Sequence, residues 1–285
     1  MTEAVLIGAR ALLMISLALL MGLTLFWVVM GKAGSRPVIV SLTIAGLAFS
    51  MLWLLASATA MADASIAAPD WTSIWVLLTM TPIGSVLAVR GAALACVLAL
   101  AFAGRDRIAL APAAIATATL AWTGHAGATE GWAGVMHRVA DVAHIWAAAG
   151  WIGALAVLLH AIFRLRQDAD VQSISRMLSR FSLMGTLLVT TLIVSGVINL
   201  ITIVELSQLL ALADNRYGWL LGGKLALFGL MLGLAAANRW RLTPALDAGG
   251  NNAVGHLRVS LFVETSAAIM IVGLVAWLGT LDPTA

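Results

Sequence analysis

Long apolar runs are the feature that most constrains how this chain can fold. An apolar segment of about 20 residues can cross the hydrocarbon core of a bilayer as a helix. The sequence has eight such runs, at residues 4–30, 37–62, 84–103, 108–125, 137–163, 178–204, 217–238 and 256–280. Only 10% of its 285 residues are charged, against roughly 25% in a soluble domain. The sequence therefore predicts an all-α, polytopic transmembrane helical bundle of about eight spans.

Two further segments are apolar but are not expected to cross. Residues 69–83 are interrupted by Pro82, and Trp71 and Trp75 suit the depth of lipid headgroups, so we expect an interfacial helix there. Segment 205–216 occupies the equivalent place before the seventh span. The chain start lacks the positive charge of a secretory signal, so the first run is predicted to be a retained span.

The loops between the spans alternate in charge. Four of them are basic, around residues 31–36, 104–107, 164–180 and 239–258, whereas the others carry mainly acidic residues. Positively charged loops usually stay in the cytoplasm. Both termini are therefore predicted to lie on the outer, periplasmic side.

The two halves of the chain resemble each other at an offset of 134 residues. At this offset Arg90 aligns with Lys224, and the first span aligns with the fifth. The match favours a four-span half at residues 1–125 and a second at residues 126–285. Because each half has an even number of spans, the two repeats would have parallel topology.

The fifth span carries ionisable side chains that lipid tolerates only at a cost. On a helix, His137, Asp141, His144 and Trp151 fall in one stripe that begins at the outer surface. At 1.5 Å per residue, His144 would lie about 10 Å below that surface. Ionisable groups at such depth face the bundle interior or water. This stripe is therefore the candidate functional site.

Two interpretations of the stripe remain open. In a structural one, the imidazoles hydrogen-bond to neighbouring helices and Asp141 pairs with a buried cation, for which Lys224 and Arg90 have similar estimated depth. In a functional one, the stripe binds a metal. Imidazole is a common ligand of copper and zinc, and thioether sulfur favours Cu(I).

For a metal, the candidate ligands are His125, His137 and His144. His125 ends the fourth span, and an eleven-residue loop separates it from His137. Since His137 and His144 are about 10 Å apart along the helix, we expect successive positions on a path rather than one closed site. Asp141 is spaced to orient an imidazole, and Met136 is a candidate soft ligand near the same surface.

Three other polar residues lie within spans and are candidates for the pathway. Asn199 lies in the sixth span, Lys224 in the seventh and Glu264 well inside the eighth. Glu264 is either a deeper position for a cation or proton, or the neutraliser of a buried basic group. The lone Cys96 excludes an intrachain disulfide and a CxxC site.

Several motifs combine into a recognisable pattern. The fifth span reads H-x3-D-x2-H-x6-W-x-G, GHAG surrounds His125, residues 216–244 contain "NRWRLTP", and residues 261–283 end in "LGTLDP". Together they resemble the CopD/PcoD family of copper-resistance membrane proteins. The resemblance covers most of residues 120–283, and the first half more loosely.

The resemblance implies a multi-pass protein of the bacterial inner membrane, surrounded by lipid, that acts in copper uptake or homeostasis. It also implies a periplasmic copper-binding partner of the CopC type. The outer loops are too short to hold such a domain, so a partner would be a separate protein.

The leading hypothesis is therefore a copper permease, carrying Cu(I) or Cu(II) inward past His125, His137 and His144. One alternative is a membrane redox protein that binds b-type haem through paired histidines. Another is a copper sensor that binds without transporting. The sequence shows no nucleotide motif, no enzyme constellation and no basic run typical of nucleic-acid binding.

Overall fold

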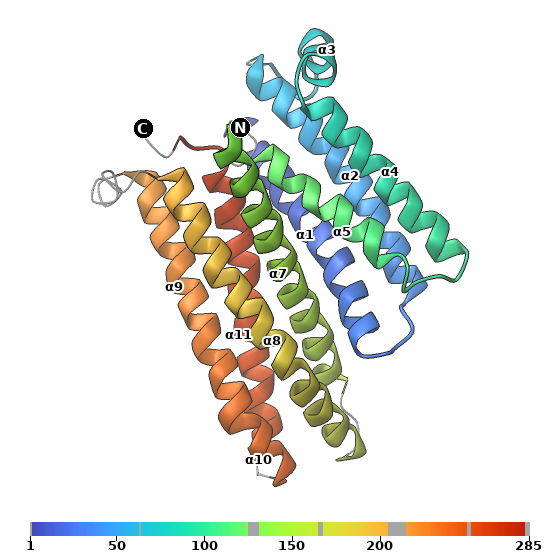
Figure 1. Cartoon of the computed structure of the whole chain (residues 1–285), viewed down its shortest axis with the longest axis vertical. Coiled ribbons are helices and arrows are strands. Elements are labelled where there is room, and N and C mark those ends of the chain that lie inside the picture. Colours follow the sequence, from blue (N-terminus) through green and yellow to red (C-terminus); the bar gives the residue numbers. More distant parts are fainter. Residues whose placement is uncertain are drawn as a thin grey trace.

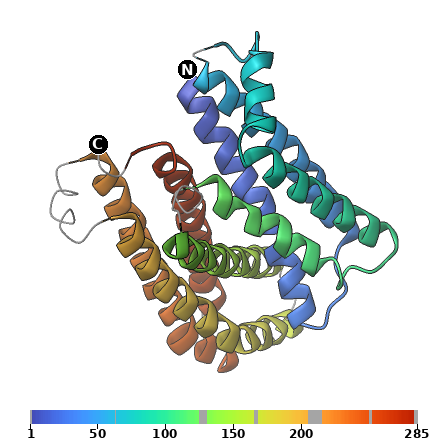
Figure 2. The ribbon, with the colours of Figure 1, turned by 45° about the horizontal axis from the view of Figure 1, so that its top comes forward.

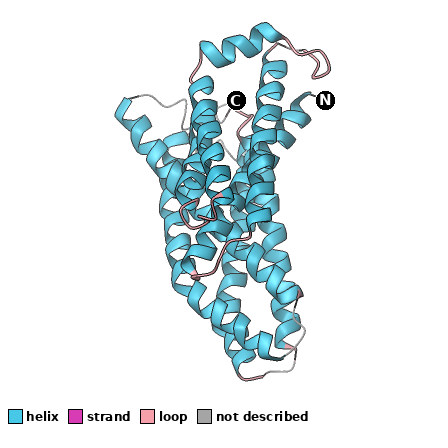
Figure 3. Cartoon of the chain, turned by 90° about the vertical axis from the view of Figure 1, so that its right-hand side faces the viewer, coloured by secondary structure: helices cyan, strands magenta, loops and turns pink. Residues whose placement is uncertain are grey.

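The computed structural model describes residues 2–62, 64–124, 131–164, 168–204, 215–249 and 252–282. In these ranges the chain forms helices joined by short loops, without strands (Figure 3). Among these described residues, seven helices are long and apolar enough to cross a membrane. They are α1 (Thr2–Val29), α2 (Arg36–Met61), α4 (Ile83–Phe102), α7 (Gly131–Phe163), α8 (Asp168–Ile203), α9 (Arg216–Ala237) and α11 (Ala253–Leu278). The prediction of an all-α polytopic membrane protein is confirmed.

The fourth predicted span, residues 108–125, forms a shorter helix than expected. It consists of α5 (Leu110–Ala118) followed by the 3-10 helix η1 (Thr119–Thr123). Fourteen residues reach about 20 Å, which is less than the roughly 30 Å of a hydrocarbon core. The apolar run is nearly long enough to cross the membrane, but of its described residues, 108–124, only residues 110–123 are helical.

The helix expected within residues 69–83 is present as α3 (Trp71–Thr79). The Asp70 carboxylate caps it by accepting hydrogen bonds from the backbone N–H groups of Thr72 and Ser73, at 3.1 and 3.0 Å. Trp71 and Trp75 are 72% and 66% exposed. Of the equivalent segment 205–216, residues 205–214 lie outside the described ranges.

The seventh span continues beyond its predicted end. After α9 the chain winds into the π-helix η4 (Asn238–Leu242) and then into α10 (Thr243–Asp247). Pro244 in the first turn of α10 has no N–H and crowds the carbonyl four residues earlier. A wide π turn before a proline accommodates this loss without ending the helix.

The ends of the long helices alternate between two faces of the bundle. We call the face with both termini the terminal face (Figure 1); there α1, α7 and α9 begin and α2 and α11 end. At the other face, which we call the basic face, α1, α4, α7 and α10 end and α2, α5, α8 and α11 begin. Basic residues of the loops identified in the sequence, among them Arg36, Arg105, Arg164 and Arg239, lie at or beside these helix ends, so their charge is gathered at one end of the bundle.

Helices α1 and α7 form the centre of the molecule. Figure 2 shows α7 between a group made of α1, α2, α4 and α5 and a group made of α8, α9 and α11. The two central helices meet at Gly22 and Gly153, where a Cβ on Gly22 would lie 1.9 Å from the Ala149 carbonyl oxygen. A Cβ on Gly153 would lie 2.1 Å from the carbonyl carbon of Gly22. Only glycine lets the backbones approach this closely.

We predict that Gly22→Ala and Gly153→Ala each destabilise the protein by about 1–3 kcal/mol, since the added methyl group meets backbone that cannot move aside. Thermal unfolding in detergent, followed by tryptophan fluorescence, measures the effect. Gly8→Ala is the matched control on the same helix, because nothing lies within 4 Å of its Cβ position. Equal unfolding temperatures for Gly22→Ala and Gly8→Ala would contradict the close helix contact.

Candidate functional site

A cavity of about 430 Å³ lies between α1, α7, α8, α9 and α11. Near the terminal face it is lined by His137, Tyr217 and Leu278, and its deeper residues include Trp151 and Met231. The walls are mainly aliphatic and aromatic side chains, with a small group of polar and charged ones on α1, α7, α8 and α9. Such a composition is typical of a ligand site, where a few polar groups orient the ligand.

The structure brings most of the sequence-predicted residues to this cavity. Its lining includes His137, Asp141, His144, Trp151, Asn199 and Lys224. Met136 is 48% exposed and Glu264 is buried elsewhere, and neither lines the cavity. His125 lies outside the described residues.

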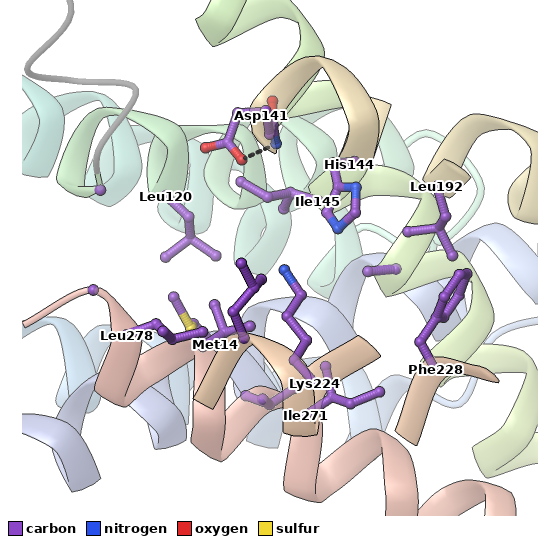
Figure 4. Close-up of a pocket in the computed structure, with 18 of the residues that line it drawn as sticks. Met14, Leu120, Asp141, His144, Ile145, Leu192, Lys224, Phe228, Ile271 and Leu278 are labelled. Atoms are coloured by element: carbon purple, nitrogen blue, oxygen red, sulfur yellow. Dashed lines mark hydrogen bonds between the residues drawn. The ribbon is translucent and has the colours of Figure 1, made fainter. Parts of the chain in front are cut away.

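Asp141 is held by a neighbour on another helix. Nδ2 of Asn199, on α8, donates a hydrogen bond to Oδ1 of Asp141 at 3.1 Å. Lys224 from α9 and Arg10 from α1 both interact electrostatically with this carboxylate. Figure 4 shows Asp141 and His144 along one side of the pocket, with the Lys224 side chain reaching toward them from the opposite side. The carboxylate therefore has two positive neighbours from two different helices.

The hydrogen bonds of His144 determine which ring nitrogen is free. Nδ1 of His144 lies 3.0 Å from Oγ of Ser195, and the Ser195 hydroxyl donates its single proton to the Thr191 carbonyl. Ser195 therefore accepts from Nδ1–H, and Nε2 carries the lone pair. This is the usual arrangement of a metal-binding histidine, in which one ring nitrogen donates to a neighbour and the other is available to a ligand.

Soft and aromatic groups complete the lining. Met14 on α1 and Met231 on α9 both line the cavity. Trp151 on α7 is 4% exposed and packs edge-to-face on Phe228 of α9, with ring centroids 6.4 Å apart. These two rings lie about two helical turns deeper than His144, by the spacing along α7. They belong to the deeper, apolar part of the lining.

The donor set suits a soft or borderline cation more than a hard one. Imidazole and thioether are ligands of copper, whereas hard cations prefer several oxygens. Within the described ranges, no three His, Cys, Asp or Glu side chains converge as a closed metal cage. His137, 2% exposed at the start of α7, and His144 instead line one cavity at two levels of the same helix.

One of the two cations considered as partners of Asp141 lies elsewhere. Arg90 is 1% exposed on α4, and its Nε donates to Oγ1 of Thr119 at 2.7 Å. Arg90 and Lys224 have similar estimated depths in their spans, so the sequence could not show which of them faces Asp141. The answer depends on which helices pack together, and no residue of α4 lines the cavity.

Four residues in or beside the cavity were not predicted from the sequence: Arg10, Met14 and Met231, which line it, and Ser195, which contacts His144. Arg10 is a lone charge in the first span, and such a charge is by itself a signal of an interior position. Ser195 lies four residues before Asn199 and thus on the same helix face. Met14 has no comparable signal, because methionine in a span is usually packing.

We predict that Asp141→Asn destabilises the protein by about 3–5 kcal/mol, because Lys224 and Arg10 lose their shared counter-charge. Adding Lys224→Met should restore part of that loss, with a coupling of about 0.5–3 kcal/mol. Thermal unfolding of the two single variants and the double variant in detergent measures both quantities. Strictly additive effects would show that Asp141 and Lys224 do not interact.

Comparisons with known proteins identify the family to which the chain belongs. Residues 1–135 match the family model described as Copper resistance protein D-like, N-terminal domain, and residues 175–278 match the model Copper resistance protein D. The chain is 35% identical to "Copper resistance protein D" of Pseudomonas syringae pv. tomato over 306 aligned residues, covering 99% of this chain and 98% of the relative. No solved structure is significantly similar to it. The chain therefore belongs to the copper resistance protein D family.

Proposed function

We propose that this protein carries copper across the bacterial inner membrane, with the cavity as its entry site. The basic face would lie in the cytoplasm and the terminal face, with both termini, in the periplasm. The gathering of basic loops at one end of the bundle supports this orientation. Family membership supports copper as the substrate.

One observation carries the proposal: His137, His144, Met14 and Met231 all line a single cavity among the spans. Imidazole nitrogen and thioether sulfur are donors that copper accepts and that hard cations avoid. The lone pair on Nε2 of His144 supplies a first ligand whose ring orientation Ser195 maintains. His137 is the second histidine, nearer the terminal face.

The charges around Asp141 would limit how tightly a cation is held. Asp141 attracts a cation, while Lys224 and Arg10 oppose one. A transport site must bind its ion well enough to admit it and weakly enough to release it. An open set of ligands with mixed charges meets that requirement better than a closed cage.

Delivery by a separate periplasmic copper-binding protein of the CopC type is part of the proposal. The chain has no nucleotide-binding motif, so the driving force would be an ion gradient or removal of copper inside the cell. We propose a transporter or permease rather than an enzyme.

We predict that His137→Ala combined with His144→Ala lowers copper uptake into proteoliposomes by about tenfold or more, because both imidazole ligands are lost. The matched control is His160→Ala combined with His256→Ala, since these two histidines are exposed and lie outside the cavity. Uptake is measured with Cu(I) and Cu(II) separately. Wild-type uptake by the cavity double variant would contradict the entry site.

The same preparations separate the alternative functions. A Soret band in the visible spectrum of the purified protein would favour a haem protein. Stoichiometric copper binding without uptake in vesicles would favour a sensor. Among described histidines, His137 and His144 lie on one helix, whereas haem ligation by two histidines needs facing helices.

We further predict that Ser195→Ala weakens copper binding about 10- to 100-fold, because the imidazole of His144 loses the acceptor that orients it. Ser195→Thr, which keeps the hydroxyl, should restore most of the affinity. Thr190→Ala is the control, since Thr190 is exposed on the same helix and bonds only to the Thr186 carbonyl. Equilibrium dialysis against copper gives the affinities, and equal losses for Ser195→Ala and Thr190→Ala would exclude the orienting role.

A further inference from the structure

A second polar cluster lies outside the cavity and is not used by the proposed copper site. Glu264 on α11 is 2% exposed, and Nδ2 of Asn238 donates a hydrogen bond to its Oε1. Asn238 begins the π-helix η4, one element beyond the cavity-lining part of α9. The cluster is thus closer to the basic face than the cavity is.

An oxygen atom in this cluster has unused bonding capacity. Asn238 and Ser260 are 6% and 7% exposed. Within the part of the chain that the structure describes, Oδ1 of Asn238 has no hydrogen-bond partner, while Ser260 interacts with the Glu264 carboxyl. Ser260 lies one helical turn before Glu264 on the same face of α11. Buried polar atoms are nearly always paired, so the unpaired amide oxygen of Asn238 beside a carboxyl indicates a missing ligand.

The π-helix explains how these atoms come together. In η4 the Thr243 hydroxyl donates to the Asn238 carbonyl at 2.8 Å, five residues back. Such a wide turn rotates side chains away from their regular helical directions and is frequent at functional sites. Asn238 thereby faces α11 from inside the bundle, rather than lipid.

Glu264 has no basic counter-charge among the described residues. The side chains that interact with its carboxyl are Asn238 and Ser260. Three charged residues of the surrounding elements have other partners: Lys224 interacts with Asp141, Arg258 with Phe163 and Ile162, and Arg239 with Thr186. The other charged or titratable residues of these elements are exposed, namely His160, Arg241, Asp247 and His256. A carboxylate this deeply buried needs a compensating positive charge.

We propose that Glu264, Asn238 and Ser260 form a second ion site, which binds a hard monovalent cation, either a proton or Na⁺. The donors are carboxyl, amide and hydroxyl oxygens, which suit such a cation and not soft copper. The existence of this site is independent of the copper site. Its role as the coupling ion for copper movement rests on the proposed function.

The test follows the Glu264 carboxyl by infrared difference spectroscopy of the full-length protein in lipid nanodiscs, without copper. One series steps the pH in choline chloride, and another replaces choline chloride with NaCl at constant pH. We expect a carboxyl signal that responds to one of the two, is lost in Glu264→Gln, and persists in Thr265→Ala, the neighbouring control. A response to pH alone identifies a proton, and a response to NaCl identifies Na⁺.

Two further variants keep the test valid if Glu264→Gln does not fold. Asn238→Ala and Ser260→Ala retain the carboxyl but remove one oxygen each, so each should shift the cation midpoint by about tenfold. A carboxyl signal that responds to neither cation, or midpoints unchanged in both variants, would overturn the ion site.

Copper uptake into vesicles under imposed pH or Na⁺ gradients then tests the coupling. If wild-type uptake responds to a gradient and that of Glu264→Gln does not, the coupling role is supported. If both respond equally, it is overturned. If the wild-type protein shows no copper uptake but keeps the infrared signal, the proposed function is contradicted and the ion site is still supported.

Discussion

The close contact between α1 and α7 is the constraint on which the rest of the structure depends. Gly22 and Gly153 bring the two backbones together in the middle of the bundle. Nearer the terminal face, Arg10 and Met14 of α1 line the same cavity as Asp141 and His144 of α7. The glycine contact therefore sets the distance between the helices that carry the charged groups and the candidate metal ligands.

The absence of water inside a bilayer explains how the remaining polar groups are arranged. Each buried ionisable group must find a partner, a cavity or a bound ion, because lipid offers none. Asp141 has Asn199, Lys224 and Arg10 around the cavity, whereas Glu264 has only neutral neighbours. The rings of Trp151 and Phe228 pack edge-to-face in the deeper part of the cavity lining. The proposed copper entry site and the proposed ion site around Glu264 therefore differ in the chemistry of their donors.

Much of this arrangement could be predicted from residues close together in the chain. The stripe of His137, Asp141 and His144 follows from helical spacing, and the structure places all three on one cavity. The partner of a residue on another helix could not be predicted in the same way. Lys224 and Arg90 were equivalent by depth, yet only Lys224 reaches Asp141, because α9 borders the cavity and α4 does not. Ser195, which sets the tautomer of His144, was missed for the same reason.

By itself, the sequence determined the membrane class, the order of the long helices, the family and the helix face that carries the histidines. These depend on apolar length and on spacing within one helix, both of which are local properties. Only the tertiary structure decided that the run at residues 108–125 winds as a short helix, that Arg10 and two methionines join the cavity, and that Glu264 belongs to a separate oxygen-lined cluster. These depend on how helices pack, through contacts between residues far apart in the chain, which no periodicity encodes.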